Sequence, residues 1–472
     1  MEPIKTELVV VGAGPGGYTA AFYAADLGRQ VLLVEQEPRL GGVCLNRGCI
    51  PSKALLHVAK LIEEARDSAE RGVIFDPPRL DLAKLRAWKD SILQKLGAGL
   101  AFLAQKRGVR VLTGRGYFED SQTLRVETPQ GQQLVHYDKA IIAVGSKAAM
   151  PKAFDLGNPR IMTATEALEV EEVPADLLIV GGGYIGMELG TVYSTLGSRV
   201  VVVEALDRLL SGADPDLLRP IEQYARKHFK DVRTRTTVAQ MATAGRQIKV
   251  TLDQDGRTVE ELYDRVLVAV GRVPNDEDLG LENTRVERDE RGFIVVNDRQ
   301  QTADPHIYAI GDIVGGALLA HKAAREARVA VEVIHGEESA FRGITIPAVV
   351  FTSPELAWAG LTETEARAKG IPVEVARFPW TASGRAMTFD HTEGLTKLII
   401  EPDSERILGV GIVGHGAAEL ISEGVLAVEM GATARDLAES IHPHPTLSET
   451  LMEAAEAFYG YATHTFARRK KD

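Results

Sequence analysis

The chain has 472 residues, of which 45% are hydrophobic and 25% charged, values that are ordinary for a folded globular protein and argue against disorder. At about 150 residues per domain, this length predicts roughly three domains. The formal net charge of −12 repels nucleic-acid backbones and anionic lipids, so we expect neither nucleic acid nor a membrane as a partner.

The two ends of the sequence predict neither a leader nor an anchor. No apolar run approaches the roughly 20 residues that a membrane-spanning helix needs, and the first strand pattern already starts at Glu7. We therefore expect a cytoplasmic protein. The basic run Arg468-Arg469-Lys470-Lys471 departs from the acidic charge of the chain, and we expect it to be a solvated terminus.

The first predicted unit is a strand, a glycine loop, a helix and a second strand, at residues 7–11, 12–17, 18–27 and 31–34. The loop matches the dinucleotide-binding fingerprint at Gly12, Gly14 and Gly17. These glycines permit a tight turn, a close approach to a pyrophosphate and close packing of the helix. Glu35 follows Gly12 by 23 residues, where a carboxylate can bind ribose hydroxyls. A purely structural turn with a surface glutamate is the less favoured alternative.

The only two cysteines of the sequence, Cys44 and Cys49, fall within six consecutive residues. Two inert buried thiols would not require such clustering, and the flanking glycines allow the pair to form a disulfide. Pro51 suits the first turn of a helix, which places Cys49 near a helix N-terminus, where the dipole stabilises a thiolate. We expect Cys44 in the preceding loop. Lys53, four residues after Cys49, brings a cation to the same helix face.

The same arrangement returns with strands at 177–180 and 200–203 around a helix at 187–196. Its loop repeats the fingerprint at Gly181, Gly183 and Gly186, and Glu204 again follows the first glycine by 23 residues. A carboxylate there repels the 2′-phosphate of NADP and binds the free hydroxyl of NAD, so NAD is favoured. Arg208 nearby leaves NADP open as an alternative.

The remaining pattern predicts a return to the first domain and then a third domain. Residues 137–145 and 263–271 resemble each other, and each reads as a buried strand that ends in glycine. A strand at 306–310 and a helix at 319–334 follow, then a hairpin of strands 395–400 and 407–413, a helix ending near Gly431 and a helix beginning near Thr446. The predicted domains are residues 1–146 together with 272–340, residues 147–271, and residues 341–472.

The segment His442-Pro443-His444-Pro445-Thr446-Leu447-Ser448-Glu449 carries a candidate base. An imidazole that titrates near neutral pH can take a proton from a thiol, and Glu449 can fix the tautomer of His444. Thr446 and Glu449 also form a capping-box pattern for the following helix, and the spacing alone leaves both interpretations open. His442 is the less favoured base.

Over essentially its whole length the sequence resembles the pyridine nucleotide-disulfide oxidoreductases, and within them the dihydrolipoyl dehydrogenases, flavoproteins of 2-oxo acid dehydrogenase and glycine cleavage complexes. The resemblance implies an α/β fold with two Rossmann-like domains, for FAD (1–146 and 272–340) and for NAD (147–271), and a C-terminal α+β dimerisation domain (341–472). Electrons would pass from dihydrolipoamide to a Cys44–Cys49 disulfide, then to FAD and to NAD. Cys44 would exchange with substrate, and Cys49 would be the charge-transfer thiolate facing the flavin.

The resemblance also assigns further residues. Lys53 would pair with Glu188 beside the flavin, Asp312 would hold the ribitol, and Gly271 would lie on the nicotinamide side. His444 would come from the other subunit, which implies a homodimer. The other FAD-binding residues implied are Gly116, Gly145, Ser146, Ala320 and His321. No metal is implied.

The implied partner is the lipoyl-bearing acyltransferase component of a 2-oxo acid dehydrogenase complex or the glycine cleavage lipoyl protein. A glutathione reductase-like enzyme is the nearest alternative, but it uses NADPH, which Glu204 disfavours. A mercuric reductase would need further cysteines near the C-terminus. A redox-inert assembly subunit would have no reason to combine Cys44, Cys49, Lys53 and His444.

Overall fold

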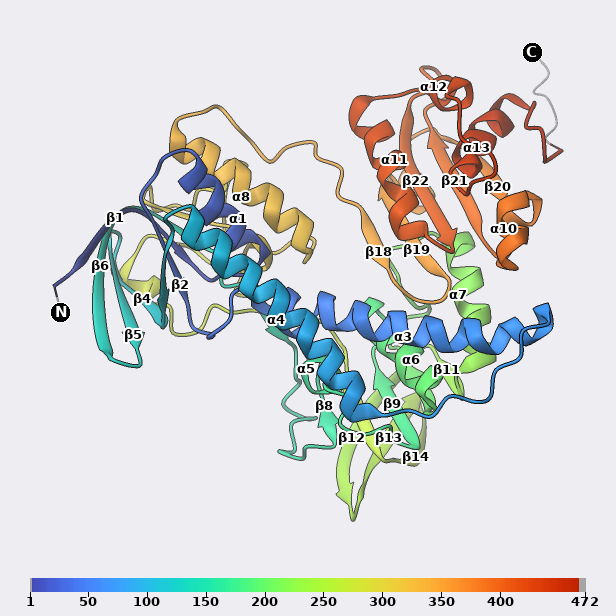
Figure 1. The fold of residues 1–472 in the computed structure, drawn as a ribbon, viewed down its shortest axis with the longest axis horizontal. Helices are drawn as coiled ribbons and strands as arrows, with labels where there is room; N and C mark the ends of the chain where they lie inside the picture. The colour runs from blue at the N-terminus through green and yellow to red at the C-terminus, as the bar shows by residue number, and fades with distance from the viewer. Residues whose placement is uncertain (1, 467–472) are drawn as a thin grey trace.

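The computed structural model describes residues 2–466, so the basic run at 468–471 lies outside the described residues. Figure 1 shows the first nucleotide-binding unit on the left, the second below and the C-terminal sheet at the upper right. The predicted α/β class with two Rossmann-like units and a C-terminal α+β unit is confirmed. No helix within residues 2–466 has both the length and the apolar character needed to cross a membrane.

The first unit is built around a mainly parallel sheet. β1 (Ile4–Val11) and β2 (Val31–Glu35) pair in parallel, with α1 (Pro15–Asp26) between them in the chain. α1 and α8 (Ala320–His335) pack together over one face of the strands, and α8 corresponds to the helix predicted at 319–334. The sheet continues through β3 (Arg110–Thr113), β4 (Arg115–Asp120), β5 (Thr123–Thr128), β6 (Gly131–Ile142) and β17 (Ile307–Ala309), in the order β3-β2-β1-β6-β5-β4, with β17 pairing with β6.

The two cysteines belong to two consecutive helices. α2 (Gly42–Arg47) carries Cys44, and α3 (Cys49–Asp67) begins at Cys49. The predicted loop around Cys44 was therefore wrong, because Gly41 and Gly42, with φ of +113° and +58°, form the start of a helix instead of a flexible connection. η1 (Ser68–Arg71) and the long α4 (Leu82–Lys106) follow, and α3 and α4 contact each other.

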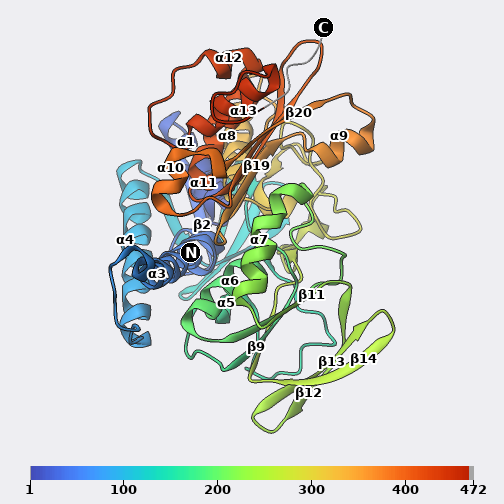
Figure 2. The ribbon, with the colours of Figure 1, turned by 90° about the vertical axis from the view of Figure 1, so that its right-hand side faces the viewer.

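The second unit has a parallel sheet in the order β11-β10-β9-β15-β8. The prediction of one strand at 263–271 was wrong. Tyr263 is the last residue of the antiparallel strand β14 (Arg257–Tyr263), and the parallel strand β15 (Arg265–Val268) begins two residues later. An antiparallel sheet of β12, β13 and β14 projects from the bottom of the molecule (Figure 2). The elements are β8 (Ile161–Met162), α5 (Ala164–Ala167), β9 (Asp176–Val180), α6 (Tyr184–Leu196), β10 (Arg199–Val203), α7 (Pro215–His228), β11 (Asp231–Arg233), β12 (Thr236–Ala244), β13 (Gln247–Gln254), β14 (Arg257–Tyr263) and β15 (Arg265–Val268).

Short elements connect the two units beside the glycine loops. β7 (Ser146–Ala148) and β16 (Arg272–Pro274) form an antiparallel pair, so the chain leaves and re-enters the first unit at one place. η2 (Leu281–Asn283) and η3 (Gly311–Val314) lie in the returning segment.

The C-terminal unit is an antiparallel sheet in the order β18-β19-β22-β21-β20, covered by α11 and α13. The predicted hairpin at 395–413 is confirmed, and α11 ends at Met430 before Gly431, as predicted. The last helix begins at Glu449 instead of Thr446. The elements are β18 (Ala348–Val350), β19 (Glu355–Gly360), α9 (Glu363–Lys369), β20 (Glu374–Pro379), η4 (Trp380–Ala382), α10 (Gly384–Phe389), β21 (Leu395–Ile400), β22 (Ile407–Gly414), α11 (Ala417–Met430), α12 (Ala434–Glu439) and α13 (Glu449–Tyr459).

Candidate active site

A cavity of about 590 Å³ runs from the first glycine loop to the two cysteines. Twelve of the residues predicted for this region line it: Gly12, Gly14, Glu35, Cys44, Cys49, Lys53, Gly116, Gly145, Ser146, Glu188, Asp312 and Ala320. Gly17 and His321 do not. The His321 ring instead bonds the carbonyl oxygen of Pro347 at 2.8 Å.

The three glycines of the first loop have three different physical roles. A Cβ at Gly12, where φ is +99°, would lie 2.5 Å from the carbonyl oxygen of Ala143. A Cβ at Gly17 would lie 1.8 Å from the carbonyl oxygen of Gly12, so only glycine lets α1 approach the strand. A Cβ at Gly14 would meet nothing closer than Gly42, at 4.0 Å, which leaves room beside the backbone for a bound group.

The second loop repeats this geometry. A Cβ at Gly181 would lie 2.3 Å from the carbonyl oxygen of Ala269, and one at Gly186 would lie 2.1 Å from that of Gly181. The space beside Gly183 is open to 4 Å. Both loops therefore have the shape that a pyrophosphate requires at the N-terminus of a helix. The main cavity reaches the start of α6, where Tyr184 lines it.

The two glutamates after the loops also occupy equivalent positions. Glu35 accepts hydrogen bonds from the backbone N–H groups of Ala13 at 2.7 Å and Glu37 at 2.9 Å. Glu204 accepts the corresponding bonds from Gly182 at 2.7 Å and Leu206 at 2.8 Å, so each carboxylate fixes its own glycine loop. A carboxylate oxygen has a second lone pair, which leaves capacity for a ribose hydroxyl.

The Sγ atoms of Cys44 and Cys49 are 2.7 Å apart, and both residues are free thiols. A hydrogen bond from Cys44, the charge of Lys53 and the backbone at the start of α3 lower the pKa of Cys49 below its ordinary value, although burial opposes them. The contact with Cys49 raises the pKa of Cys44, and burial adds to that effect. The site therefore favours a thiolate on Cys49.

Glu188 of α6 is buried, and its carboxylate binds the helix that begins at Cys49. Its Oε2 accepts hydrogen bonds from Lys53 at 2.8 Å and from Ser52 at 3.0 Å. Its Oε1 accepts one from the backbone N–H of Phe351 at 3.0 Å, and the Lys53 ammonium lies 4.3 Å from the centre of the Phe351 ring. One carboxylate thus joins α3, α6 and the segment after β18.

Arg272 is a cavity residue that the sequence reasoning missed. Its Nε donates to Ser146 Oγ at 2.7 Å and lies 3.7 Å from Asp312 Oδ2, while its Nη2 donates to the Ser146 carbonyl at 2.6 Å. Ser146 also bonds Asp312. The signal was available, because Arg272 directly follows the predicted cofactor residue Gly271. Arg115, Tyr184 and Asn275 line the same cavity and were likewise not predicted as site residues.

His444 and Glu449 are paired as predicted, with His444 Nδ1 at 2.8 Å from Glu449 Oε1. The other carboxylate oxygen accepts the backbone N–H of Thr446 at 2.8 Å. Glu449 therefore orients the imidazole, whereas the predicted capping box does not form, because the helix begins at Glu449 itself with Ser448 as its N-cap and no side-chain cap bond. His442 is bonded through both ring nitrogens, to Glu423 at 2.7 Å and to the Ser440 carbonyl at 2.8 Å. His444 keeps Nε2 available, and its side chain is 73% exposed.

His444 does not line the cavity that contains Cys44 and Cys49. The last residue in the chain to line it is Ala323, so within residues 2–466 the C-terminal unit contributes nothing to its wall. The candidate base and the candidate thiols of one chain are therefore separate.

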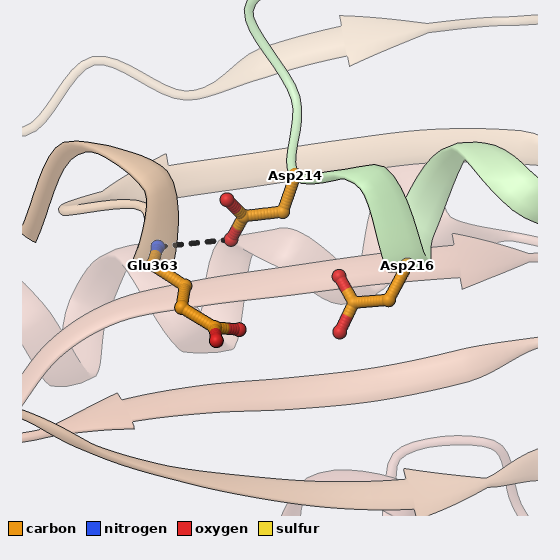
Figure 3. Close-up of side chains that lie close together, drawn as sticks. All are labelled: Asp214, Asp216 and Glu363. Atoms are coloured by element: carbon orange, nitrogen blue, oxygen red, sulfur yellow. Dashed lines mark hydrogen bonds between the residues drawn. The ribbon is translucent and has the colours of Figure 1, made fainter. Parts of the chain in front are cut away.

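Asp214, Asp216 and Glu363 are the carboxylates of the described chain that lie close enough together to hold a metal ion (Figure 3). Lys397 already fills the centre of this cluster, with Nζ 2.9 Å from both aspartates and 2.7 Å from Glu363. The cluster is thus a buried ion network that joins α7 to the C-terminal sheet.

Comparisons with known proteins agree over nearly the whole chain. The family model described as pyridine nucleotide-disulphide oxidoreductase matches residues 6–327, and the model of its dimerisation domain matches residues 346–455. A dihydrolipoyl dehydrogenase of Vibrio cholerae is 46% identical over 473 residues, which cover 99% of each chain. One from Haemophilus influenzae is 48% identical over 462 residues, which cover 98% of this chain and 96% of that one.

Two solved structures share the fold over the full length. LpdA from Mycobacterium tuberculosis has a TM-score of 0.89 at 28% identity and covers 96% of this chain and 99% of its own. The HOCl-induced flavoprotein disulfide reductase RclA from Escherichia coli, solved as a Cu(II) complex, has a TM-score of 0.86 at 28% identity and covers 97% and 99%.

Proposed function

The chain belongs to the pyridine nucleotide-disulphide oxidoreductase family, and we propose that it is a dihydrolipoyl dehydrogenase that oxidises dihydrolipoamide and reduces NAD. The observation that carries this proposal is the pair of sulfur atoms, 2.7 Å apart, at the wall of a cavity that also contains a dinucleotide loop. A thiolate-forming pair next to a cofactor cavity is what thiol–disulfide chemistry coupled to a nucleotide requires.

The residues around the cavity fit FAD, and those of the second loop fit NAD. Gly14 leaves the backbone open for a pyrophosphate, Glu35 is placed for the ribose, and Asp312, held by Ser146 and Arg272, is placed for the ribitol. Gly183 and Glu204 offer NAD the same two features in the second unit. Bound FAD supplies the two-electron chemistry that connects the thiols to the pyridine nucleotide.

The chain's own residues perform the thiol exchange. In the oxidised enzyme a thiolate of dihydrolipoamide attacks Cys44 Sγ and breaks its bond to Cys49, which leaves as a thiolate. The second substrate thiol then attacks the mixed disulfide, so that lipoamide is released with its S–S bond formed and Cys44 is freed. The substrate loses two electrons and two protons: the cysteine pair gains the electrons, one proton ends on the freed Cys44 thiol, and the other passes to the base. His444 takes the substrate proton at Nε2, and Lys53 stabilises the Cys49 thiolate.

We also propose a homodimer in which His444 of one subunit serves the cysteines of the other. The support is that His444 lies outside its own chain's cavity. In addition, the segment that matches the dimerisation domain exposes large apolar side chains, and the most exposed of them are Leu426, Met430 and Ile441, at 62%, 76% and 99%. A second copy would cover such a surface.

The first test of the proposed function compares two assays on the purified flavoprotein. We expect NADH formation from NAD and dihydrolipoamide, and little NADPH-driven reduction of glutathione disulfide, because Glu204 disfavours a 2′-phosphate. Activity only in the second assay would identify a glutathione reductase-like enzyme. If NADH fails to bleach the flavin absorbance, the chain is a redox-inert subunit instead.

A second test asks which subunit supplies the base. Cys49→Ser and His444→Gln are produced together with different affinity tags, and the mixed dimer is purified. If His444 acts across the interface, the mixed dimer has one complete site and about half of the wild-type activity. If His444 acts within its own chain, both sites lack a residue and the mixed dimer is inactive.

We extend the proposal to the physiological partner and location. The substrate dithiol would be carried by the lipoyl-bearing acyltransferase component of a 2-oxo acid dehydrogenase complex or by the glycine cleavage lipoyl protein. Both cysteines of the sequence lie in the redox site, which suits a reducing compartment where disulfides are mostly catalytic, so we propose the cytoplasm.

A further inference from the structure

The helix that orients the candidate base carries three carboxylates on one face. Glu449, Glu453 and Glu456 of α13 follow each other by four and three residues, so they are neighbours along the helix surface. Glu449 bonds His444, whereas the Glu453 side chain is only 4% exposed. Like charges at this spacing repel each other, so an unbalanced row would be costly to keep ionised.

The chain after α13 folds back and places a second imidazole against this row. His464 Nδ1 bonds Glu453 Oε1, and the backbone N–H of His464 donates to Glu453 Oε2 at 3.3 Å. The His464 side chain is 54% exposed, so one edge of the ring faces solvent. Two of the three carboxylates thus have a histidine partner, with His444 on Glu449 and His464 on Glu453.

Charge explains why the returning segment is held at this place. The bond to Glu453 raises the pKa of His464, burial opposes it, and the charges of Glu453, Glu449 and Glu456 raise it further. Burial acts against ionised Glu449, but bonds from Thr446 and His444, aided by the charge of His464, hold its pKa below the usual value. Glu456 Oε2 is buried and has no hydrogen-bond partner in the described chain, and the same holds for Thr465 Oγ1. No donor therefore compensates the charge of Glu456 at that oxygen.

We propose that His464 is a positioning residue for the thiol-exchange base: as an imidazolium it balances the carboxylate row of α13, keeps Glu449 ionised, and so sets the pH range over which the His444–Glu449 pair accepts a proton. The proposal rests on the proposed function, because it concerns the base of that reaction. It adds a residue that touches neither substrate nor cofactor and acts only through Glu449.

The sign of the effect follows from the arrangement. The raised pKa of His464 favours its protonated form, whose positive charge makes adding a proton to the nearby His444–Glu449 pair less favourable. Removing that charge makes protonation of the pair easier. As the pH falls, the pair is then protonated, and stops acting as a base, at a higher pH than in the wild type. The acid limb of the activity profile therefore moves to higher pH.

Other charged side chains lie on the elements that pack against α13. Most of the charged residues on α12, β20 and β21 have partners outside the row: Arg435 with Glu439, Asp436 with the backbone of Thr433, Arg377 with Asp216 and Glu363, and Lys397 with the Asp214 cluster. Glu374 of β20 is also engaged. Glu405 is occupied by Tyr459 at 2.6 Å.

The test uses the flavin-loaded enzyme and the pH profile of dihydrolipoamide oxidation. We expect His464→Gln to move the acid limb upward by about half a pH unit, the scale of one charge acting across several ångström in a largely solvated setting. His464→Arg keeps the charge and should restore the wild-type profile. The shift should shrink at about 1 M salt, where screening is strong. His136→Gln, an exposed histidine on β6, is the control and should leave the profile unchanged.

A second readout does not depend on catalysis. Imidazole NMR titration of the same holoenzyme should give His464 a midpoint above that of the solvent-exposed control, and Glu453→Gln should lower it. An unchanged acid limb in His464→Gln, or a His464 midpoint that ignores Glu453→Gln, would overturn the proposal. If the wild-type enzyme fails to oxidise dihydrolipoamide, the proposed function fails, while the titration still reports whether His464 is charged by the row.

Discussion

Lys53 of α3 and Glu188 of α6 are 2.8 Å apart, and this pair connects the helix that begins at Cys49 to the second nucleotide-binding unit. Glu188 is buried, whereas Lys53 is partly exposed to the cavity. The ammonium and the carboxylate act on Cys49 with opposite signs, since Lys53 lowers the pKa of the thiol and Glu188 raises it. Substituting each partner should therefore move the Cys49 titration in opposite directions.

Lys53→Met should raise the pH at which the Cys49 thiolate forms. The methionine keeps the length of the side chain and removes its charge, and a cation near a thiolate changes its pKa by about one unit. Thiolate ultraviolet absorbance of the reduced enzyme, with Cys49→Ser as the blank, measures the midpoint. An unchanged midpoint would mean that the start of α3 and Cys44 stabilise the thiolate without help from Lys53.

Glu188→Gln should shift the same midpoint downward, because the neighbouring negative charge is gone. The amide also places an NH₂ group among the donors Lys53, Ser52 and Phe351 N, so we expect a loss of stability of about 1 to 3 kcal/mol. Thermal unfolding and the thiolate titration separate the two effects. A midpoint that rises would show that Lys53 loses its position when Glu188 no longer holds it.

His444→Gln should reduce dihydrolipoamide oxidation by about 10²- to 10⁴-fold, the usual contribution of a positioned general base. NADH oxidation with a one-electron acceptor such as ferricyanide bypasses the thiol exchange and should persist. His442→Gln is the matched control on the same segment, because His442 bonds Glu423 and the Ser440 carbonyl. Equal losses in the two variants would argue that the segment as a whole, and not His444, is needed.

Cys49→Ser should abolish turnover and leave the flavin bound. The proposed flavin-binding residues that line the cavity, such as Glu35 and Asp312, are held by bonds that the substitution does not touch. Flavin absorbance after gel filtration measures retention. An apoprotein would show that Cys49 is needed for the structure of the cavity.

The glycine loops could be predicted from sequence because the spacing of their glycines is local. Gly17 approaches the carbonyl of Gly12, and Gly186 repeats this contact with Gly181, within a single loop. The contacts of Gly12 with Ala143 and of Gly181 with Ala269 join distant segments, which the spacing does not encode. The hairpin and the end of α11 at Gly431 were equally local.

The rest of the site depends on contacts between distant segments, which composition and spacing do not encode. Arg272 matters because the fold brings it to Ser146 and Asp312. Cys44 was placed in a loop because the glycines before it are usually loop signals. The last helix begins at Glu449 and not at Thr446, since the Glu449 side chain turns back to the Thr446 backbone and to His444.

The ion network around Lys397 also joins distant segments and predicts how stability depends on pH. Burial acts against ionised Asp214, and bonds from Thr364 and Lys397 outweigh it, so its pKa lies below the usual value. Asp216 is lowered in the same way by Lys397 and Arg377, against burial. Groups with depressed pKa values stabilise the fold above their unfolded values of about 4, and this stabilisation is lost as the pH falls through the folded values.

Lys397→Met should therefore destabilise the protein most at neutral pH, by about 3 to 5 kcal/mol, because it leaves Asp214, Asp216 and Glu363 buried or half-buried without their shared cation. The penalty should shrink as the pH falls below about 4, where the carboxylates of the variant take up protons at little cost. Thermal unfolding between pH 3 and 8 measures this, with Arg435→Ala, from an exposed pair with Glu439, as the control that changes stability by less than about 1 kcal/mol. A destabilisation that does not vary with pH would mean that Lys397 contributes through packing of its aliphatic chain and not through its charge.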